Sequence, residues 1–472
     1  MTTDILDLDA TDQLAALAAR RITAMDLLGL AMARQSQTHD QLNVVVATDT
    51  EQAMAQARAS DMRRARGEPL GALEGLPMTL KDTLDVIGMP ASAGLAALRD
   101  RRSGDSTVAA RARAAGAILW GKTNVPVMAG DWQSFNGLYG ASNNPWNLSR
   151  TTGGSSGGAA AALATGITAL EIGSDIGGSL RVPANFCGIY SHKPSWGAVC
   201  QRGHVPPHPG ARAPRDINVI GPMARSARDL KHLFSVIADH PHQAEAAPDL
   251  RSLRVGLWLD EPRFPLDPEV RAVIEAYAAS LAAAGVHIDP VSSPVDSQVL
   301  RDTYTVLLGA ILGADLSPEQ YQAMAAQRPA LLAANDPAAL SLLAYTASHL
   351  EWMEANETRA ALVDQVALAL APYDVIIAPV SPVVAFPHDH APFRSRRLTP
   401  STGEAFTYNS MLDWVALASL CHLPATCVPA GLTPGGMPVG VQLIGSNGAD
   451  AHNLAVAESF SAIRAFIPPP MI

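Results

Sequence analysis

Serines set among glycines occur at two places in the middle of this chain, and their hydroxyls could do chemistry. The first run is TTGGSSGG at 151–158, and the second is GSDIGGSLRVP at 173–183. Such a composition is typical of a flexible linker. The residues between the runs are mainly Ala, Leu and Ile, which pack inside folded structure. A linker is therefore disfavoured, and both runs are expected to lie within a folded domain.

Ser155 also fits the pattern G-x-S-x-G, in which a nucleophilic serine stands at a sharp turn between a strand and a helix. That motif requires a buried strand immediately before the serine. The preceding residues, NNPWNLSRTT, are polar and contain a proline, so the match is interpreted as accidental. The second run suggests a different role for its glycines. Glycine lets consecutive amides approach one point, so the segment from Asp175 to Ser179 predicts an oxyanion hole beside a serine hydroxyl.

A serine nucleophile needs a group that accepts its proton. The 13 histidines are scattered along the chain, and their spacing indicates no Ser/His/Asp arrangement. His192 and His204 are the nearest to the two serine runs. We interpret both as structural or loop residues.

Lysine is scarce among the 34 Lys and Arg residues. Since arginine serves wherever a plain positive charge is enough, the remaining lysines are enriched for positions that need an ammonium able to lose its proton. Lys81 lies in GLPMTLKD, whose alternation predicts a strand with Thr79 and Lys81 on one face. Enclosed away from water, its amine would have a lowered pKa and could act as a neutral base. The lysines are Lys81, Lys122, Lys193 and Lys231.

Composition narrows the class of protein. Of the 472 residues, 48% are hydrophobic and 17% charged, which predicts a compact globular chain. A net charge of −10 without a basic stripe disfavours nucleic-acid binding. No secretory signal and no membrane-spanning apolar run is visible, so we expect a cytoplasmic protein. The cysteines lack C-x-x-C spacing and are interpreted as small buried hydrophobes without zinc or disulfides. They are Cys187, Cys200, Cys421 and Cys427.

Hydrophobic periodicity places these motifs on alternating strands and helices. Residues 10–66 are predicted to be helical and to wrap the core, and an alanine-rich helix closed by Gly166 is followed by a predicted strand over 167–172. Asp267-Pro268-Glu269 has the cap, proline and acidic residue expected at a helix start. Residues 297–370 are predicted to be mostly helical. RVGLW and YDVIIAPV are predicted buried strands, and 196–215 is a predicted long loop. Alternation without a linker predicts one large α/β domain.

Eight motifs occur in order along the chain and together resemble the amidase signature family of serine hydrolases. They are GLPMTLKD, GKTNVP, NNPWN, GGSSGG, GSDIGGSLRVP, HKPSWG, IGPMARSARDL and GGMPVGVQLIG. The resemblance runs from about Leu73 to Gly445 and is most specific over 153–194. It implies a single domain, 1–472, with a mixed sheet covered by helices on both sides. Within that domain, 1–70 would be a helical wrap, 71–225 the signature core and 290–370 a helical substrate-side insertion.

The resemblance also implies roles for individual residues. Ser179 would be the nucleophile, Lys81 the base, and Ser155 the bridging serine, held by an unusual cis peptide to Ser156 or its neighbour. The oxyanion hole would comprise Ile176, Gly177, Gly178 and Ser179. Asp175 and Arg181 would brace the loop together with Ser156. Ala129, Gly130 and Asp131 would line the acyl side of the substrate pocket, and Trp132 and Gln133 would shape its entrance. Lys122 and Lys193 would make structural polar contacts. No metal or organic cofactor is implied.

The expected activity is hydrolysis of small, fairly apolar amides or anilides, with esters and carbamates accessible to the same acyl chemistry. One alternative is the glutaminase subunit of a tRNA amidotransferase, disfavoured because no serine-rich stretch follows HKPSWG. A second is a catalytically silent binding or scaffold protein, which intact Lys81, Ser155 and Ser179 disfavour. The membrane-bound fatty amide type is disfavoured because no long apolar N-terminal helix is visible. Expected partners are a small-molecule amide and, at the family level, a second copy in a homodimer.

Overall fold

The computed structural model of the chain describes residues 4–240, 245–334 and 339–470. Its centre is an eleven-stranded sheet in the order β1-β3-β2-β8-β10-β9-β16-β17-β13-β11-β12. Parallel pairs join β3, β2 and β8 near one edge and β13, β11 and β12 at the other, while antiparallel pairs join the strands between them. The strands are β1 (Val45–Thr48), β2 (Pro77–Lys81), β3 (Ile118–Thr123), β8 (Leu170–Asp175), β9 (Tyr190–Lys193), β10 (Val219–Ala224), β11 (Arg254–Leu257), β12 (His287–Pro290), β13 (Val375–Pro379), β16 (Ala425–Leu432) and β17 (Pro438–Ile444).

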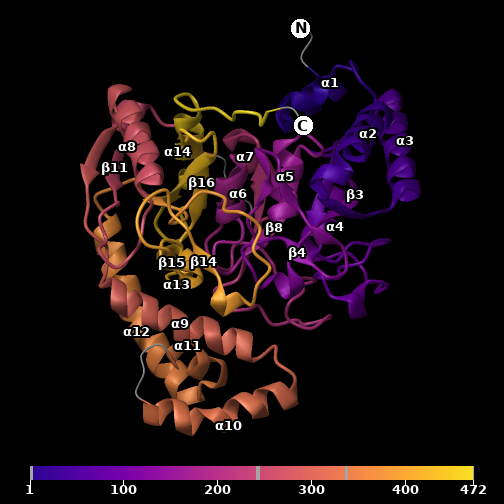
Figure 1. Ribbon diagram of the computed structural model, residues 1–472. Helices are drawn as coiled ribbons and strands as arrows, with labels where there is room; N and C mark the ends of the chain where they lie inside the picture. Colours follow the sequence, from indigo (N-terminus) through magenta and orange to yellow (C-terminus); the bar gives the residue numbers. More distant parts are fainter. Residues whose placement is uncertain (1–3, 241–244, 335–338, 471–472) are drawn as a thin grey trace.

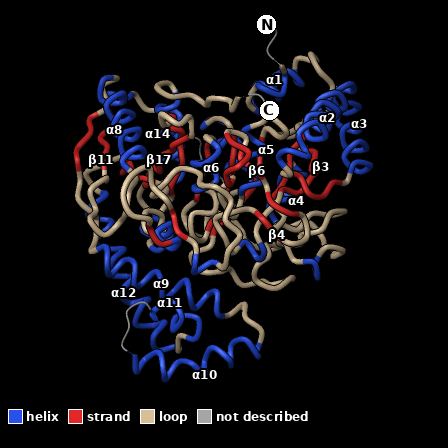
Figure 2. The backbone as a smooth tube through the Cα atoms, in the orientation of Figure 1, coloured by secondary structure: helices blue, strands red, loops and turns tan. Residues whose placement is uncertain are grey.

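Helices surround this sheet, which Figure 2 shows as a central band of strands. In sequence order, α3 and α4 pack against β3, α7 against β10, and α8 and α14 against β16. This single mixed α/β domain confirms the expected fold class. The helices are α1 (Ala10–Ala18), α2 (Ala24–Leu42), α3 (Thr50–Arg66), α4 (Thr107–Ala114), α5 (Gly157–Ala164), α6 (Arg181–Cys187), α7 (Ala227–Ile237), α8 (Pro268–Ala283), α9 (Ser297–Gly313), α10 (Pro318–Ala334), α11 (Leu340–Leu343), α12 (His349–Leu370), α13 (Ala416–Leu420) and α14 (Asp450–Ser461).

Helices α9 to α12 form a separate helical layer at the bottom of Figure 1, below one half of the sheet. Helix α9 packs against α11, α12 and α13, whereas α10 lies on the outside and buries none of its side chains. The predicted mostly helical character of 297–370 is therefore correct for 297–334 and 339–370, and the four residues between these ranges lie outside the described residues. Helix α8 begins as predicted, with the Asp267 carboxylate accepting a hydrogen bond from the Glu269 amide at 2.9 Å.

Two sequence-based boundaries were wrong. Residues 10–66 are not helical throughout, because β1 lies between α2 and α3 and pairs with β3 at the edge of the sheet. The strand predicted over 167–172 is β8 and runs from Leu170 to Asp175. Pairing with β10 extends it, since Asp175 lies opposite Val219. This shift places Ser174 and Asp175, at the start of the second glycine run, on the strand itself, directly before Ile176 and the Gly177-Gly178 pair.

The helix between the two glycine runs is packed unusually closely. Every residue of α5, GGAAAALA, is buried. A Cβ atom at Gly158 would lie 2.5 Å from the Asn124 backbone nitrogen and 2.7 Å from its oxygen. Since both are backbone atoms that cannot move aside cheaply, only glycine fits here. The first glycine run therefore admits a close approach of two backbone segments and is not a flexible joint.

Two compositional interpretations can be checked against the fold. Within the described residues, all four cysteines are free, and Cys187, Cys421 and Cys427 are buried as expected. Cys200 is only partly buried, so the interpretation was wrong for that residue. None of the described helices combines the length and apolar character needed to cross a membrane.

Candidate active site

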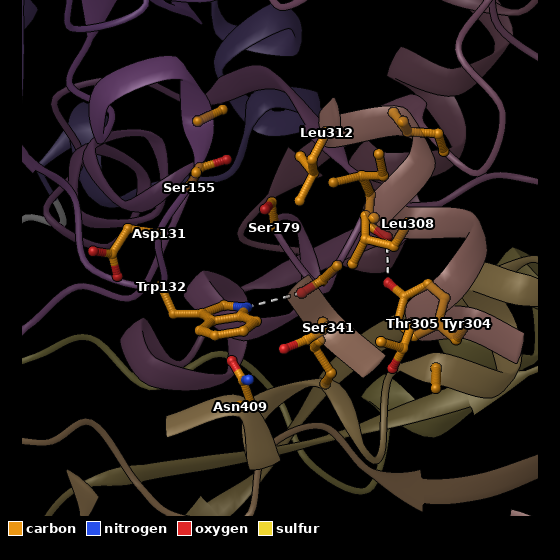
Figure 3. Close-up of a pocket in the computed structure, with 18 of the residues that line it drawn as sticks. Asp131, Trp132, Ser155, Ser179, Tyr304, Thr305, Leu308, Leu312, Ser341 and Asn409 are labelled. Carbon is orange, nitrogen blue, oxygen red and sulfur yellow. Dashed lines mark hydrogen bonds between the residues drawn. The ribbon is translucent and has the colours of Figure 1, made fainter. Parts of the chain in front are cut away.

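Neighbouring parallel strands deliver the polar residues of the site to one edge of the sheet. Lys81 ends β2, and Ser174 and Asp175 end β8, the strand that pairs with β2. Carboxyl ends of parallel neighbours lie at the same edge of a sheet. Ser155 precedes α5 and Ser179 precedes α6, and the side chains of these two serines line the same cavity (Figure 3). Segments separated by almost one hundred residues thus meet at one point.

Lys81 is wholly buried and lies at the centre of this group. Its Nζ atom is 2.7 Å from Ser155 Oγ, 2.9 Å from Ser174 Oγ and 3.3 Å from the Ser174 carbonyl oxygen. Burial lowers the pKa of Lys81 to about 7, although the nearby Asp175 and Glu171 carboxylates oppose that change. A substantial fraction of Lys81 is therefore neutral near pH 7, as a base that accepts a serine proton must be.

The two candidate serines are neighbours without being directly bonded through their side chains. The Ser156 amide donates to the Ser179 carbonyl at 3.2 Å, which joins the two serine-bearing turns. In the described part of the chain, no hydrogen bond links Ser155 Oγ to Ser179 Oγ. Hydrogen bonds used in catalysis are often long without substrate and shorten when it binds. The cis peptide lies on the N-terminal side of Ser155, between Gly154 and Ser155, and not toward Ser156.

The second glycine run forms a turn in which only some of the backbone amides donate hydrogen bonds within the protein. Asp175 accepts hydrogen bonds from the Gly178 amide at 2.8 Å and the Leu180 amide at 3.1 Å. Among the contacts of the described residues, the amides of Ile176, Gly177 and Ser179 have no acceptor. Of the four amides expected to bind an oxyanion, the Gly178 amide is thus already used, and the other three remain available.

Arg181 fixes the carboxylate that organises this turn. Its guanidinium donates to both Asp175 oxygens, at 3.0 and 3.1 Å, and both side chains are fully buried. Burial alone would raise the pKa of Asp175, but Arg181 outweighs it and lowers that pKa to about 2. Arg181 also donates to Gln442 at 2.8 Å and Ser419 at 2.7 Å. The buried Asp175–Arg181 ion pair therefore links the turn to strand β17 through Gln442 and to helix α13 through Ser419.

Two aromatic side chains donate hydrogen bonds to adjacent carbonyls of the same turn. Trp132 Nε1 donates to the Gly177 carbonyl at 2.9 Å, and the Tyr304 hydroxyl donates to the Ile176 carbonyl at 2.6 Å (Figure 3). Trp132 was expected to shape the pocket entrance, and its bond to this turn was not predicted. Tyr304 was missed, because it lies in α9, 128 residues after Ile176 in the sequence, and no local motif marks it.

His204 is a second residue that the sequence analysis missed. It was interpreted as a structural or loop histidine, yet it is buried beside the Lys81 cluster, with Nε2 2.8 Å from Ser174 Oγ. The other nearby histidine, His192, bonds Thr426 and Asp450 and is not among the residues that line the cavity. Of the remaining lysines, Lys122 and Lys193 are buried and bond backbone carbonyls, whereas Lys231 pairs with Glu458.

A cavity of about 570 Å³ opens over the serines. The signature core contributes Ala129, Gly130, Asp131 and Trp132 to its wall, as expected, and α9 contributes Leu308, Ile311 and Leu312. His204, Pro206 and Arg215 bring the loop 196–215 to the same wall.

Most charges in this wall are paired. Among the described residues, Arg394 forms no ion pair, whereas the other arginines and the aspartates of the wall take part in three ion pairs. These pairs are Arg215 with Asp315, Arg301 with Asp413 at 2.8 Å, and Asp131 with Arg396 at 2.5 Å. Paired charges leave few sites for a strongly charged ligand, and the rest of the wall is largely apolar.

Known proteins resemble this chain in sequence and fold over nearly its whole length. The family model described as Amidase matches residues 26–454. A glutamyl-tRNA(Gln) amidotransferase subunit of Salinispora arenicola (strain CNS-205) is 30% identical, over 99% of this chain and 100% of that protein. A solved structure described as an amidase has a TM-score of 0.81 and 29% identity, covering 96% of this chain and 99% of the other. A bacterial aryl acylamidase of the amidase signature family has a TM-score of 0.80 and 25% identity, covering 97% and 96%.

Proposed function

Because the chain belongs to the amidase signature family, we propose that it hydrolyses the C–N bond of small, fairly apolar amides or anilides through an acyl-enzyme on Ser179. The observation that carries this proposal is the buried Lys81 amine, 2.7 Å from Ser155 Oγ, in a cavity that also contains Ser179. A buried lysine with a pKa of about 7 can accept a proton from a serine at neutral pH.

In the acylation step, Ser179 Oγ attacks the substrate carbonyl carbon. Its proton passes to Ser155 Oγ as the Ser155 proton passes to neutral Lys81. The amides of Ile176, Gly177 and Ser179 donate to the developing oxyanion, and losing one such donor typically raises a barrier by about 3–4 kcal/mol. As the tetrahedral intermediate collapses, the C–N bond breaks and the leaving nitrogen takes a proton from Ser155, which Lys81 reprotonates. The acyl group then remains as an ester on Ser179.

Deacylation uses the same relay with water in place of the serine. Water adds to the ester carbonyl and gives a proton through Ser155 to Lys81. The C–O bond to Ser179 then breaks, the carboxylic acid leaves, and Ser179 recovers its proton. An ester or carbamate could enter the same cycle, because only the leaving atom differs.

The cavity wall supports an apolar substrate. Leu308, Leu312 and Phe393 face a space of about 570 Å³, and most charged groups beside them are paired. Leaving a charge or polar group of the substrate buried without a partner costs about 1–3 kcal/mol or more. A neutral acyl or aryl group therefore fits this wall better than the two opposite charges of a free amino acid.

A glutaminase subunit is the second candidate, and the names of the curated relatives favour it. Such a protein would hydrolyse glutamine and pass the ammonia on. Identity does not separate the two candidates, since it is 29% to the solved amidase and 30% to the amidotransferase relative. The paired charges of the cavity favour the stand-alone amidase.

Labelling with a fluorophosphonate, followed by peptide mass analysis, tests the nucleophile. We expect one adduct on Ser179, and absence of an adduct would overturn the proposed activity and favour a silent scaffold.

A parallel hydrolysis screen compares p-nitroacetanilide, p-nitrophenyl acetate, a small carbamate and L-glutamine. We expect turnover of the anilide and little of glutamine. Preferential turnover of glutamine would instead support the glutaminase of an amidotransferase.

A further inference from the structure

We propose that His204 is a positioning residue for this reaction: acting through the Ser174 hydroxyl, it leaves the lone pair of Lys81 free to face Ser155 alone. This inference rests on the proposed function, since it assigns His204 a part in activating Ser179. Four groups form a buried chain, His204–Ser174–Lys81–Ser155, with successive separations of 2.8, 2.9 and 2.7 Å. The direction of each hydrogen bond in that chain follows from the chemistry of its two ends.

The tautomer of His204 is set by a backbone carbonyl. Its Nδ1 atom lies 2.7 Å from the Pro206 carbonyl oxygen, which can only accept, so Nδ1 must carry the proton. Burial and the positive charges of Lys81 and Lys122 lower the pKa of His204 to about 3. The ring is therefore neutral at working pH, and its Nε2 atom is a bare acceptor directed at Ser174.

The Ser174 hydroxyl has one proton, and His204 determines the acceptor to which that proton points. Because Nε2 of His204 can only accept, Ser174 must donate to it. The Oγ atom of Ser174 is then left with lone pairs only, and toward Lys81 it can act only as an acceptor. His204 thus converts a group that could donate or accept into a fixed acceptor.

A neutral lysine has two N–H bonds and one lone pair. Ser174 supplies two acceptors for the N–H bonds, its Oγ at 2.9 Å and its carbonyl oxygen at 3.3 Å. The lone pair then remains for Ser155 Oγ at 2.7 Å, which must donate its own proton. The Ser155 oxygen consequently has lone pairs to receive the proton of Ser179. The relay is preset in the direction from Ser179 through Ser155 to Lys81.

Loss of the His204 acceptor would allow a second hydrogen-bond arrangement, which competes with the one that places Ser155 on the Lys81 lone pair. The Ser174 hydroxyl could then turn its proton toward the Lys81 lone pair, the same site that Ser155 uses. Misdirecting a catalytic base is costly even without a change of fold. The backbone of the segment is held independently of the imidazole, since the Asp85 amide donates to the Gly203 carbonyl and the Val205 amide to the Thr83 carbonyl. Replacing the side chain should therefore leave the loop in place.

A double-mutant cycle on His204 and Ser174 separates positioning from mere packing. The readout is the rate constant for labelling of Ser179 by a fluorophosphonate, in which the Ser179 O–P bond forms, fluoride leaves and the serine proton passes to Ser155. This probe requires no knowledge of the natural substrate. The matched control is His208→Leu, an exposed histidine of the same loop, which should label at the wild-type rate.

We expect His204→Leu to label about ten-fold more slowly or worse, and His204→Gln, whose amide can both donate and accept, to stay within about three-fold of wild type. In a Ser174→Ala background, His204→Leu should cause little further loss, because the competing hydroxyl is gone. An equal loss in both backgrounds, or an equal loss for His204→Gln, would show a structural role and overturn the inference.

A measurement on the wild-type protein tests the tautomer directly and covers the case in which His204→Leu fails to fold. The ¹⁵N shifts of His204, assigned by their loss in His204→Gln or any folded His204 variant, should show neutral imidazole with the proton on Nδ1 between pH 6 and 9. A proton on Nε2 would overturn the inference. Either failure leaves the proposed function standing if wild-type Ser179 is labelled. If wild-type Ser179 is not labelled, the proposed function fails first and this inference fails with it.

Discussion

The signature core and the helical layer α9–α12 differ in how closely their residues are packed. Between 151 and 195 every residue except Thr165 and Ile176 is buried, and glycine and alanine let backbone segments touch. In the helical layer, α10 buries no side chain and α12 buries only Leu362, Val366 and Leu370. Yet both regions line one cavity. Dense packing fixes the reacting groups, whereas α9 and Ser341 of α11, at which the helical layer meets the cavity, shape the space that a substrate fills.

This difference separates chemistry from selectivity. A change in the core should act on the rate of bond breaking or on the stability of the whole domain. A change in the helical layer should act on which substrates react. Tyr304 is an exception, because it lies in α9 and reaches back to the Ile176 carbonyl of the catalytic turn at 2.6 Å.

The largest expected effect is the loss of the core base. Lys81→Ala removes the amine that lies 2.7 Å from Ser155 Oγ and can accept its proton, so turnover of p-nitroacetanilide at pH 7 should fall about 10³-fold. Lys231→Ala is the matched control, since that lysine pairs with Glu458 at the surface and should leave turnover unchanged. Near-normal turnover of Lys81→Ala would remove Lys81 as the base.

The pH profile tests the same group without mutation. The pKa of Lys81 is lowered to about 7 by burial, against the opposing Asp175 and Glu171 carboxylates on β8, and only the neutral amine is a base. Below that pKa, kcat/KM should fall about ten-fold for each pH unit, and above about pH 8 it should level off. A rate independent of pH from 5 to 9 would contradict this assignment. Steady-state rates in a constant-ionic-strength buffer series provide the measurement.

A smaller effect is expected from a single methyl group in the core. Gly158→Ala places a Cβ atom 2.5 Å from the Asn124 backbone nitrogen and should lower the free energy of unfolding by about 1–3 kcal/mol. Gly29→Ala, in α2 with nothing within 4 Å of the new atom, should be neutral or raise it by about 0.5–1 kcal/mol. Thermal and denaturant unfolding of both variants would show this contrast, and equal stabilities would argue against tight packing at Gly158.

The smallest effect belongs to the helical layer. Leu312→Ala enlarges the cavity wall and should change the ratio of kcat/KM for a long and a short acyl anilide by about ten-fold or less. Labelling of Ser179 by a small fluorophosphonate should stay within about two-fold, because the catalytic turn is untouched. Leu350→Ala, 68% exposed and away from the cavity wall, is the control. A selectivity ratio that does not move would show that the helical layer does not contact the acyl chain.

Much of this protein could be predicted from local sequence. The α/β class, the helix that begins after Asp267 and the helical character of 297–370 follow from hydrophobic period and capping residues within a few positions of one another. The scarcity of lysine identified Lys81 as a residue that is not a surface charge, and it is wholly buried. Strand limits were less predictable, because β8 is extended to Asp175 by pairing with β10, a strand more than forty residues later.

Only the tertiary structure decided which groups share the site. His204 and Tyr304 lie in no motif, and nothing in GSDIGGSLRVP marks Ser174 as a partner of Lys81. These three residues meet the catalytic turn because β8, the loop 196–215 and α9 converge there. The sequence by itself determined the serines, the glycines and the lysine, since these depend on backbone geometry and side-chain chemistry at single positions. The orientation of their hydrogen bonds depends on distant acceptors such as the Pro206 carbonyl, whose position is set by folding of the whole domain.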